Sequence, residues 1–584
     1  MSTSSIFKDS RSPSPSERSP LLPVAPPGTS TASPEAALGS DQDGSLPTST
    51  PDDGHTTANQ TISFARGTLC ATALGFLIFL QATNISLLTT TQSEIASELD
   101  AFEKTTWFTS AYLIAMSALA PLNGKLASVF GPRICIFVST IVLAVGCLVS
   151  SIANTFEVFI AGRSLTGVGA SGIFTISIII VLELTGSKGR GLAIGLLNSG
   201  YTVGVAVGAT AAGAMLPHAP VSLIGGTILL LAIPSDFHAG TGKKHDPDDI
   251  SISTWKRVAQ LDYFGALTLT ASIVLVLYAL GSPKKIPLLP ILLSAIVFVT
   301  FVLNEVYFAS DPVIPVSLLK SRGLLLTCLA TVGYMMARWS VLFYAPTYAL
   351  AVRQWSPATA GSILIPTNGG FAIGGLVVGW LHIRRQGSFY IPSLVVYALF
   401  PLTLVALAFM STEYSSPTLY VLVVFACGAV TGAALNYNLA HLLHLTPPST
   451  HYIATSLLAT FRGFAGSFGS AIGGGLFTRR LRTSLEQGFA ERGLRHREDL
   501  VRRLLGSPAL VENLSGEDRE VAIAGYEDAL KALFLAGAGL ALIMVFVQAG
   551  TGWKSPAEKE AAGQQQSKLE EERRRLLDRQ HEEE

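Results

Sequence analysis

The chain has 584 residues, of which 49% are hydrophobic and only 14% are charged, and its formal net charge is zero. A soluble protein of this size carries about 25% charged residues. Many segments here approach the roughly 20 apolar residues that cross a bilayer, so the composition excludes a soluble protein and predicts a lipid bilayer around the chain. Because basic and acidic residues balance, no nucleic-acid partner is expected. The five cysteines fall inside apolar runs, where we expect small core residues without a disulfide framework or a metal site.

The first segment, residues 1–62, is rich in serine, proline and threonine and poor in bulky apolar residues. Such a stretch cannot bury enough surface to offset its ordering entropy, so we expect a disordered cytosolic tail. Within it, Glu17, Leu21 and Leu22 resemble an acidic dileucine signal, which sorting adaptors read for delivery to vacuoles or lysosomes. A sorting adaptor is therefore an expected partner.

The first expected transmembrane helix covers about residues 69–90 and carries Gln81 and Asn84 inside its apolar run. A polar side chain at membrane depth marks either a hydrogen bond between helices or a group that lines a solute cavity. Both interpretations stay open for Asn84. An amide cannot titrate, so Asn84 is not expected to carry a proton.

Three further apolar runs follow, joined by a glycine-rich basic turn at residues 124–133 and by a short polar turn. The third run opens with Arg163, followed by Gly167 and Gly169. An arginine inside hydrocarbon is costly, which makes Arg163 a candidate functional residue. The glycines predict that a neighbouring helix approaches closely.

These residues together resemble the major facilitator superfamily of transporters, in particular its fourteen-helix drug:proton antiporter branch. In that family the turn between the second and third helices reads G-x-L-A-D-R-x-G-R-R, which this chain matches at Gly124, Leu126, Ala127, Gly131 and Arg133. Ser128 takes the place of the usual aspartate. The fourth helix of the family carries R-x-x-x-G-x-G, which Arg163, Gly167 and Gly169 match.

The resemblance also assigns a gate. In the family, an acid after the fourth helix forms a charge network with the basic turn and holds the cytosolic side closed in one state. Here that role falls to Glu183 with Arg133 and Arg190, and to the turn glycines Gly124 and Gly131. The alternative is a pair of solvated surface turns that follow the positive-inside rule.

The implied fold is an all-α membrane protein with the major facilitator fold: two six-helix bundles plus two extra central helices, about 14 transmembrane helices in all. The expected parts are a cytosolic tail (1–62), an N-terminal bundle (63–234), a cytosolic linker (235–260), two extra helices (261–310), a C-terminal bundle (311–550) with a luminal loop (478–531), and a second cytosolic tail (551–584). The sixth helix is expected to be short or truncated by a deletion, because residues 220–234 hold too few apolar residues for a crossing of roughly 20.

Polar side chains also interrupt the apolar runs of the second half. Arg338 and Tyr344 share one run, Asn368 precedes two glycines in the next, and Asn436 lies near the end of a later run. Arg462 is another arginine at membrane depth and is surrounded by glycines.

In this fold a central cavity opens alternately to either side of the membrane. The helices satisfy their own backbone groups, which leaves inward polar side chains to meet a small-molecule substrate. The predicted substrate-binding residues are Gln81, Asn84, Arg163, Arg338, Tyr344, Asn368, Asn436 and Arg462. Arg163 and Arg338 are expected to hold a solute carboxylate through charge-assisted hydrogen bonds.

The segment from Gln81 to Gln92 resembles a fungal subgroup near the vacuolar basic amino acid transporters. With the dileucine-like signal, this implies secondary active transport of amino acids, basic ones in particular, from cytosol into the vacuole, coupled to protons. The only candidate coupling carboxylates are Glu94 and Glu183.

Three alternatives remain. A plasma-membrane exporter of drugs or metabolites would share the fold and would have a mainly apolar cavity. A nutrient receptor that signals without transport would need partner motifs in its tails. An enzyme is not expected, because no nucleophile–base pair or phosphate-binding loop stands out, and no cofactor is predicted.

Overall fold

The computed structural model describes residues 64–184, 262–309, 320–381, 389–447, 451–494 and 496–554, together with residues 200–208 except 202 and 206. Every regular element in this part of the chain is a helix. Several sequence predictions fall outside the described residues: the amino-terminal tail with Glu17, Leu21 and Leu22, Arg190, the sixth helix, the linker at 235–260 and the tail beyond residue 554.

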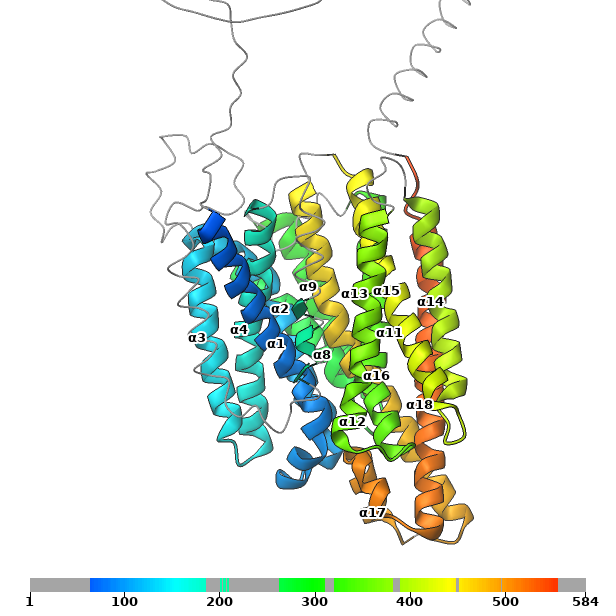
Figure 1. Cartoon of the computed structure of the whole chain (residues 1–584). Coiled ribbons are helices and arrows are strands. Elements are labelled where there is room, and N and C mark those ends of the chain that lie inside the picture. Colours follow the sequence, from blue (N-terminus) through cyan, green and yellow to red (C-terminus); the bar gives the residue numbers. More distant parts are fainter. Residues whose placement is uncertain are drawn as a thin grey trace, which may run out of the picture. The chain divides into compact units, whose positions relative to one another are not determined.

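The first half contains four long helices that run alternately between two ends of the structure (Figure 1). They are α1 (Phe64–Glu98), α2 (Thr106–Phe130), α3 (Pro132–Ser151) and α4 (Phe156–Leu184), with the short helix η1 (Phe102–Lys104) between α1 and α2. A central pair follows, formed by α8 (Tyr263–Leu280) and α9 (Leu288–Leu303), and the π-helical turn η3 (Asn304–Phe308) extends α9.

The second half has longer and more varied helices. They are α11 (Arg322–Ala351), α12 (Pro357–Ser362), α13 (Leu364–Leu381), α14 (Tyr390–Met410), α15 (Pro417–Leu445), α16 (His451–Glu491), α17 (Glu498–Gly506), η5 (Pro508–Asn513) and α18 (Gly516–Ala549). We call the end that holds α17 the cap end. The opposite end, where α1 begins and α18 finishes, is the tail end (Figure 1).

The turn between α2 and α3 depends on Gly131. Its backbone has a φ of 81° and a ψ of 149°, a conformation that glycine adopts without the strain of a side chain. Pro132 follows as the first residue of α3, where its missing N–H leaves no helical hydrogen bond unmade. Gly131, which the resemblance places in a gate, therefore has a conformational role in the turn itself.

Glycines let neighbouring helices touch through their backbones. A Cβ at Gly169 of α4 would lie 2.4 Å from the backbone nitrogen of Leu143 on α3, and one at Gly146 of α3 would lie 2.3 Å from that of Thr166. In the second half, a Cβ at Gly370 of α13 would lie 2.1 Å from the carbonyl oxygen of Phe425 on α15. Such small-residue contacts are the usual way in which helices associate inside lipid.

The two halves meet along a seam between α2 and α16. The hydroxyl oxygens of Ser110 and Ser470 lie 3.2 Å apart, and Ser117 donates a hydrogen bond to Ser467 at 3.1 Å. The central pair flanks this seam, because α8 packs against both α2 and α16. Single hydroxyl contacts of this kind are weak individually, so the polar contacts along the seam can be exchanged.

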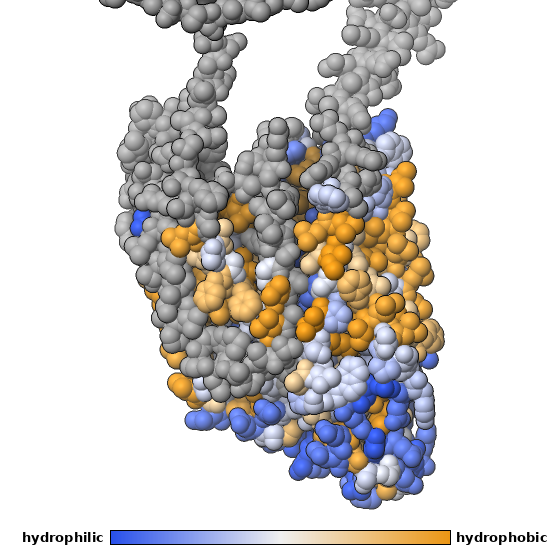
Figure 2. Space-filling model, in the orientation of Figure 1, coloured by the Kyte–Doolittle hydropathy of each residue, from blue (hydrophilic) through white to orange (hydrophobic). Residues whose placement is uncertain are grey.

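The surface is suited to lipid. Within the described residues, ten helices are long and apolar enough to cross a membrane. Large apolar side chains on them are exposed, among them Leu267, Leu292 and Phe546. Figure 2 shows an apolar band over the middle of the visible face, with hydrophilic residues gathered at the cap end. The chain is therefore an integral, multi-pass membrane protein.

Helical structure continues beyond the ends that hydropathy predicts for the last two membrane spans. The sequence predicts a luminal loop with an amphipathic helical pattern at 478–531, and within this segment α16 runs on to Glu491 and α18 already begins at Gly516. Ion pairs join the two extensions, for example Arg480 with Asp528 at 2.7 Å. The two extensions pack as a helical hairpin, and its many charged residues keep the mean hydropathy of the segment below that of a membrane span.

The cap, which we define as residues 498–513 (α17, η5 and the residue between them), rests on the first half. A Cβ at Gly506 would lie 2.5 Å from the Cα of Phe102, so the backbone of the cap touches η1 directly. Arg502 on α17 pairs with Asp100 at 2.7 Å. These contacts connect the second half to the first at the cap end.

Glu103 and Arg482 make another connection between the halves at this end. Arg482, on the extended part of α16, donates a hydrogen bond of 2.7 Å to the Glu103 carboxylate. Burial raises the pKa of the Glu103 carboxyl, but the hydrogen bond and charge of Arg482 outweigh that effect and hold the pKa below its usual value. The pair therefore persists in a mildly acidic medium.

Close packing at Gly169 gives a direct test of the helix contacts. Gly169→Ala places a methyl group against the α3 backbone, so we expect a loss of about 1–3 kcal/mol in stability. Gly75→Ala is the matched control, because nothing lies within 4 Å of a Cβ there. Thermal unfolding of the purified variants measures the difference, and equal melting temperatures for Gly169→Ala and the parent protein would contradict the packing described.

The Glu103–Arg482 pair lies outside the cap, but it ties η1 to α16, and α17 packs on η1, so the pair predicts how the cap responds to pH. A group whose pKa is lowered by folding stabilises the folded form above its ordinary pKa, about 4.3 for glutamate, and loses that contribution as the pH falls through the lowered value. Hydrogen exchange in α17, corrected for intrinsic rates, should stay slow at about pH 5 and rise only below the ordinary glutamate range.

Glu103→Gln should speed this exchange at neutral pH, because the amide cannot pair with the Arg482 charge. Glu486→Gln is the control, since Glu486 also faces Arg482, at 3.7 Å, but belongs to the same helix. Unchanged exchange in Glu103→Gln would show that the pair does not hold the cap.

Candidate functional site

Three hollows follow one another along the seam. The central cavity, of about 610 Å³, lies between α2, α4, α11, α13 and α16. Its lining includes Arg338, Trp339, Asn368, Phe371, Arg462 and Tyr201. It therefore brings together three of the predicted substrate-binding residues, Arg338, Asn368 and Arg462.

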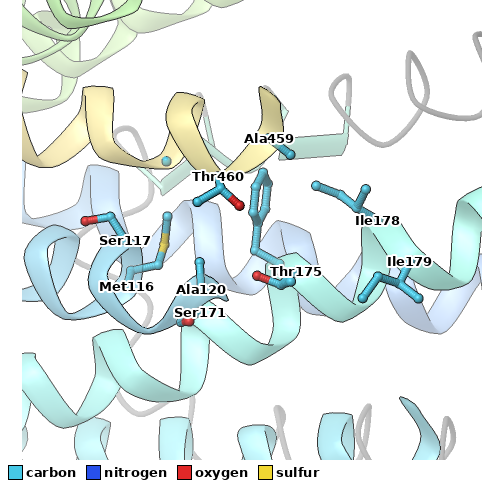
Figure 3. Close-up of a pocket in the computed structure, with 11 residues that line it drawn as sticks. Met116, Ser117, Ala120, Ser171, Thr175, Ile178, Ile179, Ala459 and Thr460 are labelled. Carbon is cyan, nitrogen blue, oxygen red and sulfur yellow. The ribbon is translucent and has the colours of Figure 1, made fainter. Parts of the chain in front are cut away.

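The tail-side hollow, of about 480 Å³, adjoins the central cavity and shares Met116, Phe174 and Gly463 with it. Figure 3 shows its labelled lining residues: Ser117, Met116 and Ala120 from α2, Ser171, Thr175, Ile178 and Ile179 from α4, and Ala459 and Thr460 from α16. The hollow is thus bounded by first-half helices on one side and by a second-half helix on the other.

The cap-side hollow, of about 550 Å³, carries many hydroxyl groups and three aromatic rings. Tyr344 lies here, with its ring centroid 4.4 Å from that of Phe477. Leu505 and Pro508 of the cap complete the lining. The cap therefore covers this end of the series of hollows.

Arg338 on α11 is held by neutral groups. Its Nη1 donates to Thr431 Oγ1 at 3.0 Å and its Nη2 to Asn368 Oδ1 at 3.1 Å. The guanidinium carbon lies 4.1 Å from the centroid of the Phe371 ring. Only 5% of the residue is exposed, so water contributes little to its solvation.

Asn368 on α13 has unused hydrogen-bonding capacity. Its Oδ1 accepts from Arg338, but its Nδ2 has no partner, although only 3% of the residue is exposed. A buried amide donor without a partner costs free energy, and a solute that lies in the cavity would relieve that cost.

Arg163 and the other first-half candidates form a separate cluster that does not line any of the three hollows. Arg163 Nε donates to the Phe108 carbonyl at 3.1 Å, and its Nη1 donates to Asn84 Oδ1 at 2.5 Å. The guanidinium carbon lies 4.8 Å from the centroid of the Tyr112 ring. Arg163 thus ties α4 to both α1 and α2.

Gln81 links this cluster to the central cavity. Its Nε2 donates to the sulfur of Met116 at 3.2 Å, and Met116 lines both the central cavity and the tail-side hollow. Asn84 donates from Nδ2 to Cys147 Sγ at 3.5 Å, so both ends of its amide bond other helices.

The remaining sequence candidates lie elsewhere. Asn436 donates to the Gly432 carbonyl of its own helix at 3.3 Å and lies outside the three hollows. Gly124 and Arg133 flank the α2–α3 turn at the tail end, whereas the side chain of Glu183 is outside the described residues. The proposed gate network is therefore not described.

Sequence reasoning missed several lining residues. Thr431 orients Arg338 but looks like any threonine in an apolar helix, since such hydroxyls usually bond their own backbone. Trp339 and Phe371 look like core aromatics until the cavity shows them beside Arg338. Among the described residues, no group of histidine, cysteine, aspartate or glutamate side chains could hold a metal ion.

Known proteins resemble this chain in sequence and in fold. A family model described as Major Facilitator Superfamily matches residues 74–470. The MFS-type efflux pump LUC4 of Fusarium sp is 26% identical over 448 residues, which cover 72% of this chain and 76% of the relative. Vacuolar basic amino acid transporter 1 of Saccharomyces cerevisiae is 27% identical over 308 residues, which cover 52% of this chain and 54% of the relative.

A solved structure, that of a bacterial homologue of the human lysosomal transporter Spinster in an inward-facing and occupied conformation, has a TM-score of 0.54 at 14% identity, covering 84% of this chain and 97% of that chain. This likeness concerns the fold alone, and it confirms the expected all-α membrane architecture. The family model covers more than half of the chain, and the relatives are transporters rather than enzymes. The chain therefore belongs to the major facilitator superfamily of membrane transporters.

Proposed function

We propose that this protein is a secondary active transporter that carries small solutes with a carboxylate group, amino acids foremost, from the cytosol into the vacuole by alternating access. The observation that supports this best is the pairing of Arg338 with Asn368 at the wall of the central cavity. A guanidinium group and an amide donor side by side suit a carboxylate, which accepts several hydrogen bonds at once.

The seam supplies what alternating access requires. The hollows lie between the halves, and the serine contacts along α2 and α16 are single hydrogen bonds. Leu505 and Pro508 of the cap line the cap-side hollow, so a solute released at that end would pass the cap. Rocking of the two halves about the central cavity would open one end and close the other.

The vacuolar membrane is suggested by the name of the yeast relative and by the dileucine-like signal at Glu17, Leu21 and Leu22, and basic substrates are suggested by that name alone. The direction into the vacuole is the one that the sequence resemblance implies. That signal, and an adaptor that would read it, stay predictions. Aromatic rings such as Trp339 and Phe343 are the described groups that would attract a cationic side chain.

Protons remain the proposed coupling ion. Asn84 cannot titrate, and Glu94 is exposed near the cap end of α1. The other sequence candidate, Glu183, has its side chain outside the described residues. The coupling group is therefore not assigned.

An exporter of metabolites is the second candidate, because the lining also favours apolar solutes. Besides its polar residues, the central cavity is lined by Leu113, Phe174, Met335, Leu342 and Phe371. Efflux is also the activity in the name of the Fusarium relative. Such an exporter would act at the plasma membrane.

Uptake by isolated vacuoles tests the proposal. Vacuoles that contain the protein should accumulate labelled amino acids faster than vacuoles that lack it, and a proton uncoupler should abolish the difference. Lysine, arginine and histidine examine the basic class, with glutamate and phenylalanine beside them. Equal uptake across the panel, together with lower solute retention in whole cells that express the protein, would favour the exporter instead.

Arg163 should be essential for transport even though it lies behind the cavity wall. Arg163→Ala removes the bonds that tie α4 to α1 and α2, so we expect at least about a tenfold loss of transport in a protein that still folds and reaches its membrane. Arg163→Lys should recover little, because a single ammonium nitrogen cannot occupy both positions from which Nε and Nη1 donate to the Phe108 carbonyl and to Asn84.

Asn123→Ala is the matched control for this prediction. It also removes a hydrogen bond between α2 and α4, from Asn123 Nδ2 to Ser171 Oγ at 2.8 Å, but it removes no charge. Uptake by Arg163→Ala at the rate of the parent protein would refute the role given to this arginine.

A further inference from the structure

We propose that the central cavity selects solutes by negative net charge, and that its ligand is an amphipathic organic anion whose carboxylate binds Arg338 and Asn368. This inference rests on the proposed transport function, and it replaces the amino acids named there as the foremost substrates with organic anions. It opposes the basic amino acids in the name of the yeast relative.

The charge of Arg338 is solvated but not neutralised by its described contacts. An arginine stays protonated in a protein, and its two hydrogen-bond acceptors here, Thr431 and Asn368, are both neutral. None of the ion pairs between described residues includes Arg338. A buried cation of this kind gains most from an anion brought to it.

The amide of Asn368 gives an independent indication of the same ligand. Its Nδ2 is buried and lacks a partner, while its Oδ1 is engaged by Arg338. The unmet group is thus a donor next to a cation, and both residues line the cavity. A carboxylate would accept a hydrogen bond from Asn368 Nδ2 and would neutralise the charge of Arg338. An ammonium group, which has only donors and is itself positive, would do neither.

The sign of the charge in the lining points the same way. Arg462 contributes a further guanidinium group to the wall of the central cavity, and none of the described residues that line this cavity is an aspartate or a glutamate. In a site shielded from water, a solute cation is repelled by both arginines, and a solute anion is attracted by both.

The other lining residues indicate what the solute carries besides its carboxylate. Phe371 lies under the Arg338 guanidinium group, and Trp339 stacks on Phe343 with their ring centroids 5.4 Å apart. An aromatic or apolar body joined to a carboxylate fits these walls.

Three probes with one body and three charges test this inference: phenylacetate, phenylalanine and phenylethylamine. Their binding to the full-length purified protein in lipid nanodiscs is measured by calorimetry. We expect phenylacetate to bind at least about tenfold more tightly than phenylalanine, and phenylethylamine not to bind measurably. Tighter binding of phenylethylamine than of phenylacetate, or no binding of any probe, would overturn the inference.

Two variants at the site make the test specific. Arg338→Gln removes the cation and should weaken phenylacetate binding at least about tenfold. Asn368→Asp keeps the shape of the side chain but places a carboxylate beside Arg338, so it should weaken phenylacetate binding as strongly while the folded state persists. It therefore serves even where Arg338→Gln fails to fold.

Arg479→Gln is the control variant. Arg479 also uses its guanidinium group on neutral acceptors, the carbonyls of Leu280 and Ser282 at 2.8 Å, but it lies outside the central cavity. Its phenylacetate affinity should equal that of the parent protein. If Asn368→Asp bound phenylacetate with the affinity of the parent protein, the anion would bind at another site, and the proposal would fail.

Counterflow in proteoliposomes separates this inference from the transport proposal. Benzylsulfonate and lysine, which stay charged and do not cross lipid unaided, are the labelled solutes. Exchange of benzylsulfonate but not lysine is the expected result. Exchange of lysine alone overturns the charge selection and leaves transport standing. Anion binding by calorimetry with no exchange of either solute supports the site and counts against transport.

Discussion

An arginine side chain keeps its proton inside a membrane, so its charge must be met by neighbouring polar groups or by a ligand. Much of the first and second halves of this transporter is arranged around that constraint. Arg163 is met by a backbone carbonyl and by Asn84, and Arg338 by a hydroxyl and an amide. These acceptors are all neutral, so they orient each guanidinium group and leave its charge in place.

The two arginines differ in what surrounds them, and this separates their roles. Arg163 is enclosed by helices of the first half, and its hydrogen bonds connect α4 to α1 and α2. Arg338 lies at a cavity wall on the seam, where a neighbouring amide donor is still unmet. The glycines make both arrangements possible, because helices whose backbones touch allow short side chains such as Thr431 and Asn368 to reach a shared partner.

Transport by this architecture requires contacts that hold in one state and exchange in another. Along the seam these are serine pairs, which lose little free energy when one hydroxyl replaces another. At the cap end, ion pairs to Asp100 and Glu103 join the halves outside the apolar band. The pair to Asp100 is exposed and the pair to Glu103 is half-buried, so each contributes modestly and can hold the cap end together without fixing it permanently.

The sequence predicts the helices, the membrane and the family well, because long apolar runs and the motifs around Gly131 and Arg163 are local signals. It also singles out Arg338, Asn368 and Arg462, because a polar side chain at membrane depth costs free energy unless it has a partner or a function. Which of these residues contact one another depends on how the helices pack, and the periodicity of a single helix carries no information about that packing. Arg163 and Arg338 look equivalent in the sequence for that reason, and only the structure shows that one lines the central cavity.

The specificity of the central cavity depends most on where a solute carboxylate lies, and a structure determined with phenylacetate at saturating concentration in a lipid nanodisc measures this directly. We expect carboxylate oxygens at about 2.7–2.9 Å from Arg338 and near Asn368 Nδ2, with the phenyl ring against Phe371 and Trp339. A ligand seated away from the seam, or Arg338 turned toward the acyl chains, would contradict it.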